Sequence, residues 1–214
     1  GAPTAWIDAH GGPATAAPPF PSGPDGMSLP AALERLVQEF VRLPGIGRKT
    51  AQRLAFGVLR YSSEEAQNLA ESVLAVKTEV RYCSRCFGFT DIDPCHICED
   101  PARDHQQVCV VEQPNNIFAI EKSGVYQGVY HVLMGTISPL DGVGPEQLKI
   151  APLRERVRHD VVQELILATN PTVHGEATAL FLQREFNETV PTLTRLARGL
   201  PAGSDLEYVD DVTL

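Results

Sequence analysis

The sequence has no long apolar run and no positive charge near its start. No stretch of the 214 residues approaches the roughly 20 consecutive apolar residues that a membrane-spanning helix needs. The first basic residue is Arg35, so the charged n-region of a secretory signal is missing. Hydrophobic residues make up 43% and charged residues 21%, which is ordinary for a folded domain. We therefore expect a folded cytoplasmic protein with no membrane contact.

Positive charge is scarce overall. The formal net charge is −9, and an acidic surface repels the phosphate backbone of nucleic acids. The exception is the segment 41–60, which carries a charge of +5 and no acidic residue, so that the other residues sum to −14. Charges are screened beyond about 8–10 Å at physiological salt, so the local charge decides where DNA can bind. The composition allows one DNA-facing patch on an acidic protein.

Residues 1–27 differ in composition from the rest of the chain. Alanine, proline and glycine occupy 17 of the first 26 positions, and Asp8 and Asp25 are the only charged side chains there. Such a stretch cannot bury enough apolar surface to offset the entropy lost on ordering. We expect a disordered extension or a remnant of recombinant expression, and we assign it no function.

Residues 28–80 have the apolar spacing of helices. The apolar residues at 33, 36, 37 and 40 follow the helical period, and a proline and two glycines within 43–47 interrupt it. The apolar residues at 51, 54, 55 and 58 form a second helical face. Ser62 and Glu65 then form a capping box for a third helix. The pattern predicts three helices, the first two joined by a hairpin.

Four of the five cysteines form two Cys-x2-Cys pairs within residues 81–104, separated by eight residues. Each pair can turn two thiolates toward one point, and two pairs complete a tetrahedron of Zn–S bonds of about 2.3 Å. A redox motif usually needs one pair at a helix start, and stable disulfides are disfavoured in the cytosol. The spacing predicts one structural zinc ion in a closed site. The expected ligands are Cys83, Cys86, Cys95 and Cys98.

Residues 105–200 alternate short apolar strands with helices. This alternation is typical of a mainly parallel sheet with helices on both faces. The expected fold class is therefore α+β with several modules: a helical N-terminal domain, a small four-cysteine zinc finger and a C-terminal α/β domain. Strands are expected at 108–112, 129–135, 164–169 and 192–198, and helices at 115–123, 152–159 and 175–186.

The segment 43–50, Leu-Pro-Gly-Ile-Gly-Arg-Lys-Thr, predicts an anion-binding helix start. The glycines keep side chains away from the turn, so the first backbone N–H groups of the second helix can face an anion, helped by the helix dipole. Phosphate contacts carry no base readout, so binding would not depend on DNA sequence. The alternative is a plain corner whose glycines only cap the first helix. The candidate DNA-binding residues are Gly45, Ile46, Gly47, Arg48, Lys49 and Arg53.

These motifs resemble those of the RecR family of bacterial recombination mediators. The segment 43–55 is similar to the helix-hairpin-helix of that family, and the cysteine pairs follow it in the family's order. Further similar segments are 108–112, 135–145, 168–173 and 203–208. The resemblance covers about residues 28–214. It implies a helix-hairpin-helix domain at 28–80, a four-cysteine zinc finger at 81–104 and, at 105–200, a Toprim domain, the fold shared with topoisomerases and primases.

The resemblance also implies that this Toprim domain is not catalytic. Catalytic Toprim sites use a glutamate at the end of the first strand and an Asp-x-Asp pair that holds magnesium. Glu112 matches the glutamate, but His174-Gly175-Glu176 replaces the pair, where RecR proteins usually have Glu-Gly-Glu. One carboxylate beside a histidine is a poor magnesium site. We expect no catalytic residue, and assign Glu112, His174 and Glu176 to partner contacts or weak divalent-metal binding, while Glu176 could equally be only a first-turn residue that suits its helix dipole.

What the resemblance implies about assembly is specific. RecR-like proteins form dimers and tetrameric rings that can enclose DNA, and they act with RecO and RecF to load recombinase at single-stranded gaps. We therefore expect a non-enzymatic mediator, associated with the nucleoid, that binds single-stranded, double-stranded and gapped DNA. The acidic segment 201–214 would serve contacts within the ring or be a solvated tail. It is shorter than the family's usual C-terminal end, which leaves the choice between dimer and tetramer open.

Two other classes of function compete with this interpretation. A Toprim-type nuclease or primase-like enzyme with a structural zinc would need an Asp-x-Asp pair after a strand, and none is expected there. A zinc module that binds only proteins would not need the acid-free basic segment 41–60. Metal-dependent cleavage or synthesis of DNA separates the enzyme from the mediator.

Overall fold

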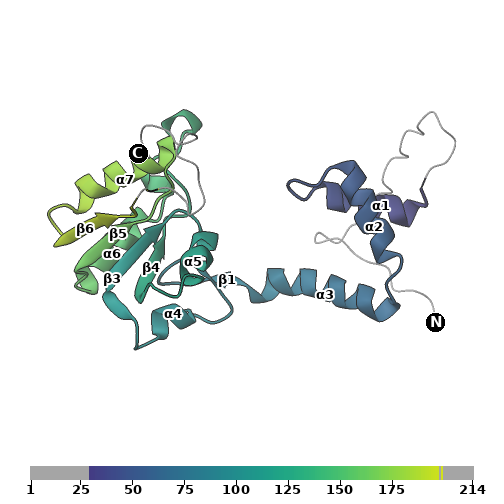
Figure 1. Ribbon diagram of the computed structural model, residues 1–214, viewed down its shortest axis with the longest axis horizontal. Coiled ribbons are helices and arrows are strands. Elements are labelled where there is room, and N and C mark those ends of the chain that lie inside the picture. Colours follow the sequence, from purple (N-terminus) through teal and green to yellow (C-terminus); the bar gives the residue numbers. More distant parts are fainter. Residues whose placement is uncertain (1–28, 198, 200–214) are drawn as a thin grey trace, which may run out of the picture. The chain divides into compact units, whose positions relative to one another are not determined.

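The computed structural model describes residues 29–197 and residue 199 (Figure 1). The expected extension at 1–27, and the acidic segment at 201–214 with its similar segment 203–208, lie outside the described residues. The chain divides into two compact units. The boundary between them along the chain lies between Glu71 and Ser72, inside helix α3 (Ser63–Glu79). The mixed α and β composition of these units confirms the predicted fold class.

In the first unit, the predicted helical hairpin is confirmed. Helices α1 (Ala31–Val41) and α2 (Arg48–Val58) pack through a small apolar cluster. Two alanines of α2 let the helices approach closely, so only a few side chains are needed to fill the interface. The turn between them contains Gly45 with φ +79°, a left-handed conformation that favours glycine. The cluster consists of Leu33, Val37, Ala51 and Ala55.

Helix α3 begins at the predicted capping box. The Ser62 N–H donates to Glu65 Oε2 at 2.7 Å, and the Glu65 N–H donates to Ser62 Oγ at 3.2 Å. These reciprocal bonds satisfy two backbone donors that a helix start leaves without intrahelical partners. The apolar side chains of α3 are not part of any core cluster, and the helix buries none of its residues.

The second unit is built on a four-stranded sheet in the order β4-β3-β5-β6, in which every pairing is parallel. This confirms the mainly parallel sheet. The strands are β3 (Asp104–Val111), β4 (Gly128–Val132), β5 (Glu164–Leu167) and β6 (Thr192–Arg195). The helices are α5 (Pro114–Glu121), α6 (Ile150–His159) and α7 (Val173–Phe186).

The two faces of this sheet are covered by different elements. Alternate residues of β3 point to opposite faces, as the pleat requires. Val108 and Val110 belong to the core that includes side chains of α6 and α7, whereas Cys109 and Val111 pack on the other face with Ile117 of α5. Cys109 is buried on this face. Helices therefore cover both faces (Figure 1).

The ends of some elements differ from the predicted ones. The strand expected at 129–135 ends at Val132, and Met134 adopts a positive φ of 65° where the chain turns away from the sheet. The strand expected at 192–198 ends at Arg195. Helices α6 and α7 each begin two residues earlier than expected, at Ile150 and Val173. Along the part of the chain that the structure describes, no helix combines the length and the apolar character needed to cross a bilayer.

Candidate zinc centre and nucleic-acid interface

The four expected zinc ligands converge on one point. Cys83 and Cys86 lie between the paired strands β1 (Arg81–Tyr82) and β2 (Phe89–Thr90), and Cys95 and Cys98 lie at and within α4 (His96–Glu99). All four side chains are buried, and their Sγ atoms lie within 4.8 Å of one another. A tetrahedral zinc ion with Zn–S bonds of about 2.3 Å spaces its sulfurs about 3.8 Å apart. The residues therefore fit one zinc ion.

Backbone donors point at the sulfur atoms. The Gly88 N–H donates to Cys86 Sγ, and the Cys95 N–H donates to Cys83 Sγ, both at 3.3 Å. Such bonds favour the thiolate, which is the form that binds zinc. The site is closed by four thiolates, so its role is structural.

The zinc finger is attached to the edge of the parallel sheet. The Val132 N–H of the outer strand β4 donates to the Cys86 carbonyl at 2.8 Å. Arg85, between the first two ligands, forms an ion pair of 2.9 Å with Asp160 at the end of α6. The Lys149 ammonium lies 5.2 Å from the centre of the Phe87 ring. The finger therefore covers a strand edge that would otherwise present unpaired backbone groups.

The predicted DNA-binding segment is exposed at the start of α2. Gly47 is the N-cap, and no side chain caps the helix, so the first-turn N–H groups remain available to an anion. Gly45, Arg48 and Lys49 are exposed. Ile46 differs, because its side chain packs against the α1–α2 cluster and its N–H donates to the Leu43 carbonyl at 3.2 Å.

The positive charge of the segment 41–60 is partly neutralised, which the sequence did not reveal. Arg48 pairs with Glu34 at 2.9 Å and Arg42 pairs with Glu39 at the same distance. Both glutamates belong to α1, so the acid-free segment meets acid from its neighbouring helix. Three basic side chains of the segment have no acidic partner within 4.0 Å among residues 29–197 and 199. They are Lys49, Arg53 and Arg60.

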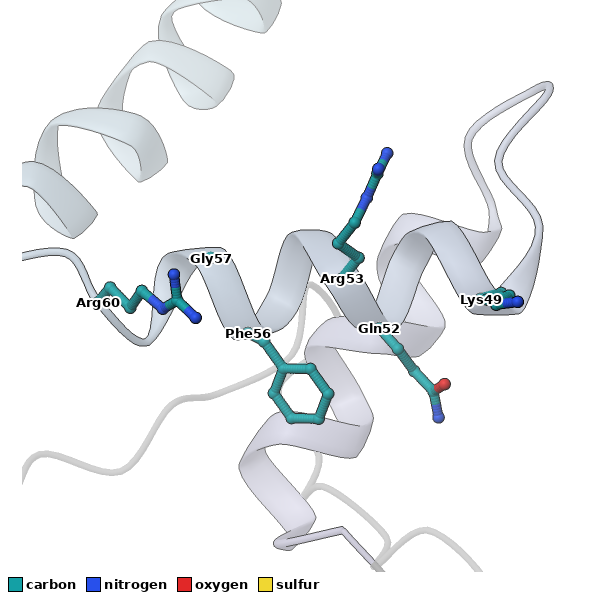
Figure 2. A pocket seen from close by; sticks show the side chains of 6 residues that line it. All are labelled: Lys49, Gln52, Arg53, Phe56, Gly57 and Arg60. Carbon is teal, nitrogen blue, oxygen red and sulfur yellow. The ribbon is translucent and has the colours of Figure 1, made fainter.

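These three cations line one pocket of about 370 Å³ on α2 (Figure 2). The sequence predicted Lys49 and Arg53 as contacts but missed Phe56, which lies on α2, and Arg60, which lies just beyond the end of that helix. The available signal was their spacing of seven and eleven residues from Lys49, which follows the helical period. The complete lining is Lys49, Gln52, Arg53, Phe56, Gly57 and Arg60.

Glu112 occupies the predicted position at the end of β3 but is engaged by the protein itself. Its side chain is 7% exposed, and it accepts hydrogen bonds from the backbone N–H and the side-chain amide of Asn170 at 2.7 and 2.5 Å. A Cβ atom at Gly175 would lie 2.1 Å from the Asn170 carbonyl oxygen and 2.7 Å from Glu112 Oε1. Only glycine allows α7 to begin this close to the glutamate.

Glu112, His174 and Glu176 form what we call the Toprim edge, at the end of β3 and the start of α7. His174 and Glu176 have partners of their own. Glu176, in the first turn of α7, binds the Arg195 guanidinium through two contacts of 2.6 and 2.8 Å. His174 Nε2 lies 3.5 Å from Ser138 Oγ. Within the described residues, the cysteine cluster is the only group of three or more side chains arranged to hold a metal ion. Divalent-metal binding by Glu112, His174 and Glu176 stays a prediction.

These observations define a class: a multi-module protein with a helical hairpin, a four-cysteine zinc finger and an α/β domain of Toprim type. Family models agree with each module. They match a RecR helix-hairpin-helix at 33–77, a RecR zinc finger domain of the four-cysteine type at 80–100, a Toprim domain at 106–197 and a RecR C-terminal segment at 199–214.

Curated relatives give the particular family. The Recombination protein RecR of Moorella thermoacetica is 52% identical over 188 residues, which cover 88% of this chain and 94% of the relative. The protein of the same name from Rubrobacter xylanophilus is 54% identical over 183 residues, covering 86% and 92%. The chain belongs to the RecR family, which confirms the resemblance seen in the sequence. Both relatives are named as recombination proteins and not as enzymes.

We predict that zinc is required for stability. Purified protein should contain about one zinc ion per chain, and Cys86→Ser should lower both the zinc content and the free energy of unfolding, the latter by about 3–5 kcal/mol, because losing a metal site is among the largest single-residue effects. That loss corresponds to roughly 10 °C in melting temperature. Elemental analysis and thermal melting check this expectation.

The matched control is Cys109→Ala, which removes a buried thiol from β3, outside the cluster of four. It should leave the zinc content unchanged and cost only the small loss of packing that accompanies removal of a sulfur atom. Unchanged stability of metal-free protein would contradict a structural role for zinc.

Proposed function

We propose that this protein is a non-enzymatic recombination mediator in DNA repair that binds DNA without sequence preference through α2. The observation that carries the proposal is the exposed row of three cations that lack acidic partners in the described part of the chain, Lys49, Arg53 and Arg60. Its relatives are named for recombination. The proposed place of action is the cytoplasm at the nucleoid, together with RecO and RecF, where it helps to load recombinase at single-stranded gaps.

The electrostatics of the first unit support phosphate binding at α2. The N-terminal N–H groups of α2 carry the positive end of the helix dipole, and Lys49 stands in that first turn. Arg53 and Arg60 extend the charge along the same face. Lys49 and Arg53 lie four residues apart on α2, about 6 Å along its axis, and Arg60 follows just beyond the end of the helix. Arg48 remains a proposed contact of smaller weight, because Glu34 already neutralises its charge.

Helix α3 supports self-association into a dimer or a tetrameric ring. It buries none of its own residues, yet it exposes four large aliphatic side chains. Exposed apolar groups gathered on one helix mark interaction surfaces. A ring of copies that places α2 toward its interior would let one acidic protein enclose DNA with several basic rows. The exposed aliphatic residues are Leu69, Val73, Leu74 and Val76.

The Toprim edge is proposed as a partner surface. Asn170 binds the carboxylate of Glu112, and Arg195 binds that of Glu176. Because these partners hold both carboxylates in place, the edge suits contact with a protein better than binding and release of a metal ion. Next to His174, Val173 is 84% exposed, and Leu140, in the segment between β4 and α6, is 96% exposed. These apolar side chains are suitable anchors for RecO or RecF.

We predict that the double variant Lys49→Ala, Arg53→Ala weakens binding of all DNA sequences nearly equally. Because two phosphate contacts are lost, the slope of log affinity against log salt should flatten by about 2. Fluorescence anisotropy with labelled DNA at several salt concentrations measures both effects.

The control is Arg35→Ala, Arg42→Ala, which removes the same charge from exposed positions on α1 and at its C-cap, in the same unit. It should change the affinity much less, since neither side chain lines the α2 pocket. Equal losses for both double variants would show that only net charge matters and would refute a contact at α2.

We also predict no cleavage, ligation or synthesis of DNA with magnesium or manganese. Wild type and Glu112→Gln should both leave gapped and supercoiled substrates unchanged, because the Glu112 carboxylate accepts hydrogen bonds from Asn170 and takes part in no reaction. Glutamine keeps one acceptor for the Asn170 N–H, so the melting temperature should fall only modestly. Gel analysis of labelled products is the measurement.

The alternative is a Toprim nuclease or primase-like enzyme. Metal-dependent scission by the wild type that is lost by orders of magnitude in Glu112→Gln would favour that alternative, because removal of a catalytic carboxylate has an effect of that size.

A further inference from the structure

The pocket on α2 holds an aromatic ring that the α1–α2 core does not use. Phe56 is 44% exposed and is absent from the cluster that joins the two helices. That cluster uses Ala51 and Ala55, which face the opposite side of α2. Phe56 is also the only aromatic residue of this helix. The packing of the described residues of this unit therefore does not account for the ring at this position.

The side chains that line the pocket together with Phe56 are polar or positively charged. The pocket lining contains three cations, one amide side chain and no acidic residue. Figure 2 shows the Arg53 and Phe56 side chains extending from α2 in opposite directions, with Arg60 in the turn that follows the helix. A Cβ atom at Gly57 would meet no atom of the described residues within 4 Å, so the helix surface is open at that position. An apolar protein partner would have to desolvate these charges without matching them.

A single-stranded nucleic acid matches this combination. Proteins that bind single strands pair a positively charged groove for the phosphates with aromatic side chains on which bases stack. A base in a duplex has both faces occupied by its neighbours, so only an unpaired base can lie against a protein ring.

We propose that the Phe56 pocket is a base-stacking subsite for an unpaired nucleotide, with Lys49, Arg53 and Arg60 holding the flanking phosphates. The inference rests on the proposed DNA-binding function and adds the chemical class that the site selects: unpaired bases, as in a single strand or beside the end of a duplex. Stacking does not distinguish one base from another. The subsite therefore adds a preference for unpaired over paired bases and no preference for a particular sequence.

The test compares two ligands of equal charge. Labelled oligothymidylate and an abasic oligonucleotide of the same length carry the same phosphates, but only the first carries bases. Fluorescence anisotropy gives their affinities for the full chain. Phe56→Leu keeps an apolar side chain and removes the ring face, and Phe56→Trp keeps a ring. Thermal melting verifies that each variant is folded, and analytical ultracentrifugation gives its oligomeric state.

We expect the wild type to bind oligothymidylate more tightly than the abasic strand. Phe56→Leu should weaken oligothymidylate binding about fivefold or more and change abasic binding less than about twofold. Phe56→Trp should retain the preference, and Lys49→Ala should weaken both ligands alike.

Two results would overturn the proposal while leaving DNA binding intact: equal affinity of the wild type for both ligands, or an equal loss on both with Phe56→Leu. If that equal loss came with a change in oligomeric state, Phe56 would belong to a contact between copies of the chain. Failure of the wild type to bind either ligand at low salt would instead refute the proposed function itself.

Discussion

The convergence of four cysteine thiolates on one zinc ion is the constraint on which the second unit depends. In residues 83–98 the buried core consists of the cysteines themselves, so the segment has little else to hold it in place. With both Cys-x2-Cys pairs bound to the metal, the Cys86 carbonyl accepts a hydrogen bond from the Val132 N–H, and Arg85 forms an ion pair with Asp160. The metal thereby secures the outer strand of the sheet as well as the finger.

Charge compensation explains how an acidic protein can present a DNA surface. The glutamates of α1 neutralise Arg42 and Arg48, whereas the cations on the outer face of α2 have no such neighbours among the described residues. Of the basic residues on α2, Arg48 therefore pairs across the hairpin with Glu34, while Lys49 and Arg53 remain available for phosphate. The packing of α1 against α2, and not the total charge of the segment 41–60, therefore decides which cations are available to DNA.

Features determined by local spacing could be predicted from the sequence. The capping box at Ser62, the hairpin at Gly45 and the two cysteine pairs depend on residues a few positions apart, and all were predicted correctly. The pairing of Arg48 with Glu34 could not be predicted, because the residues lie on different helices and meet only after packing.

Contacts at the Toprim edge were beyond prediction for the same reason. Asn170 binds Glu112 from 58 positions away, and Arg195 binds Glu176 from the next strand. Sequence similarity identified the matching residues but not their partners. Phe56 was missed because an apolar residue on a helix is normally assigned to the core, and only the structure shows that it is exposed.

The central claim is that DNA meets the protein along α2 and not at the Toprim edge. Amide hydrogen–deuterium exchange of the full chain, with and without a single-stranded oligonucleotide at low salt, tests it most directly. The account predicts that DNA slows exchange in residues 47–60 and leaves residues 110–114 and 168–177 unchanged. Slower exchange at the Toprim edge, with none along α2, would contradict it.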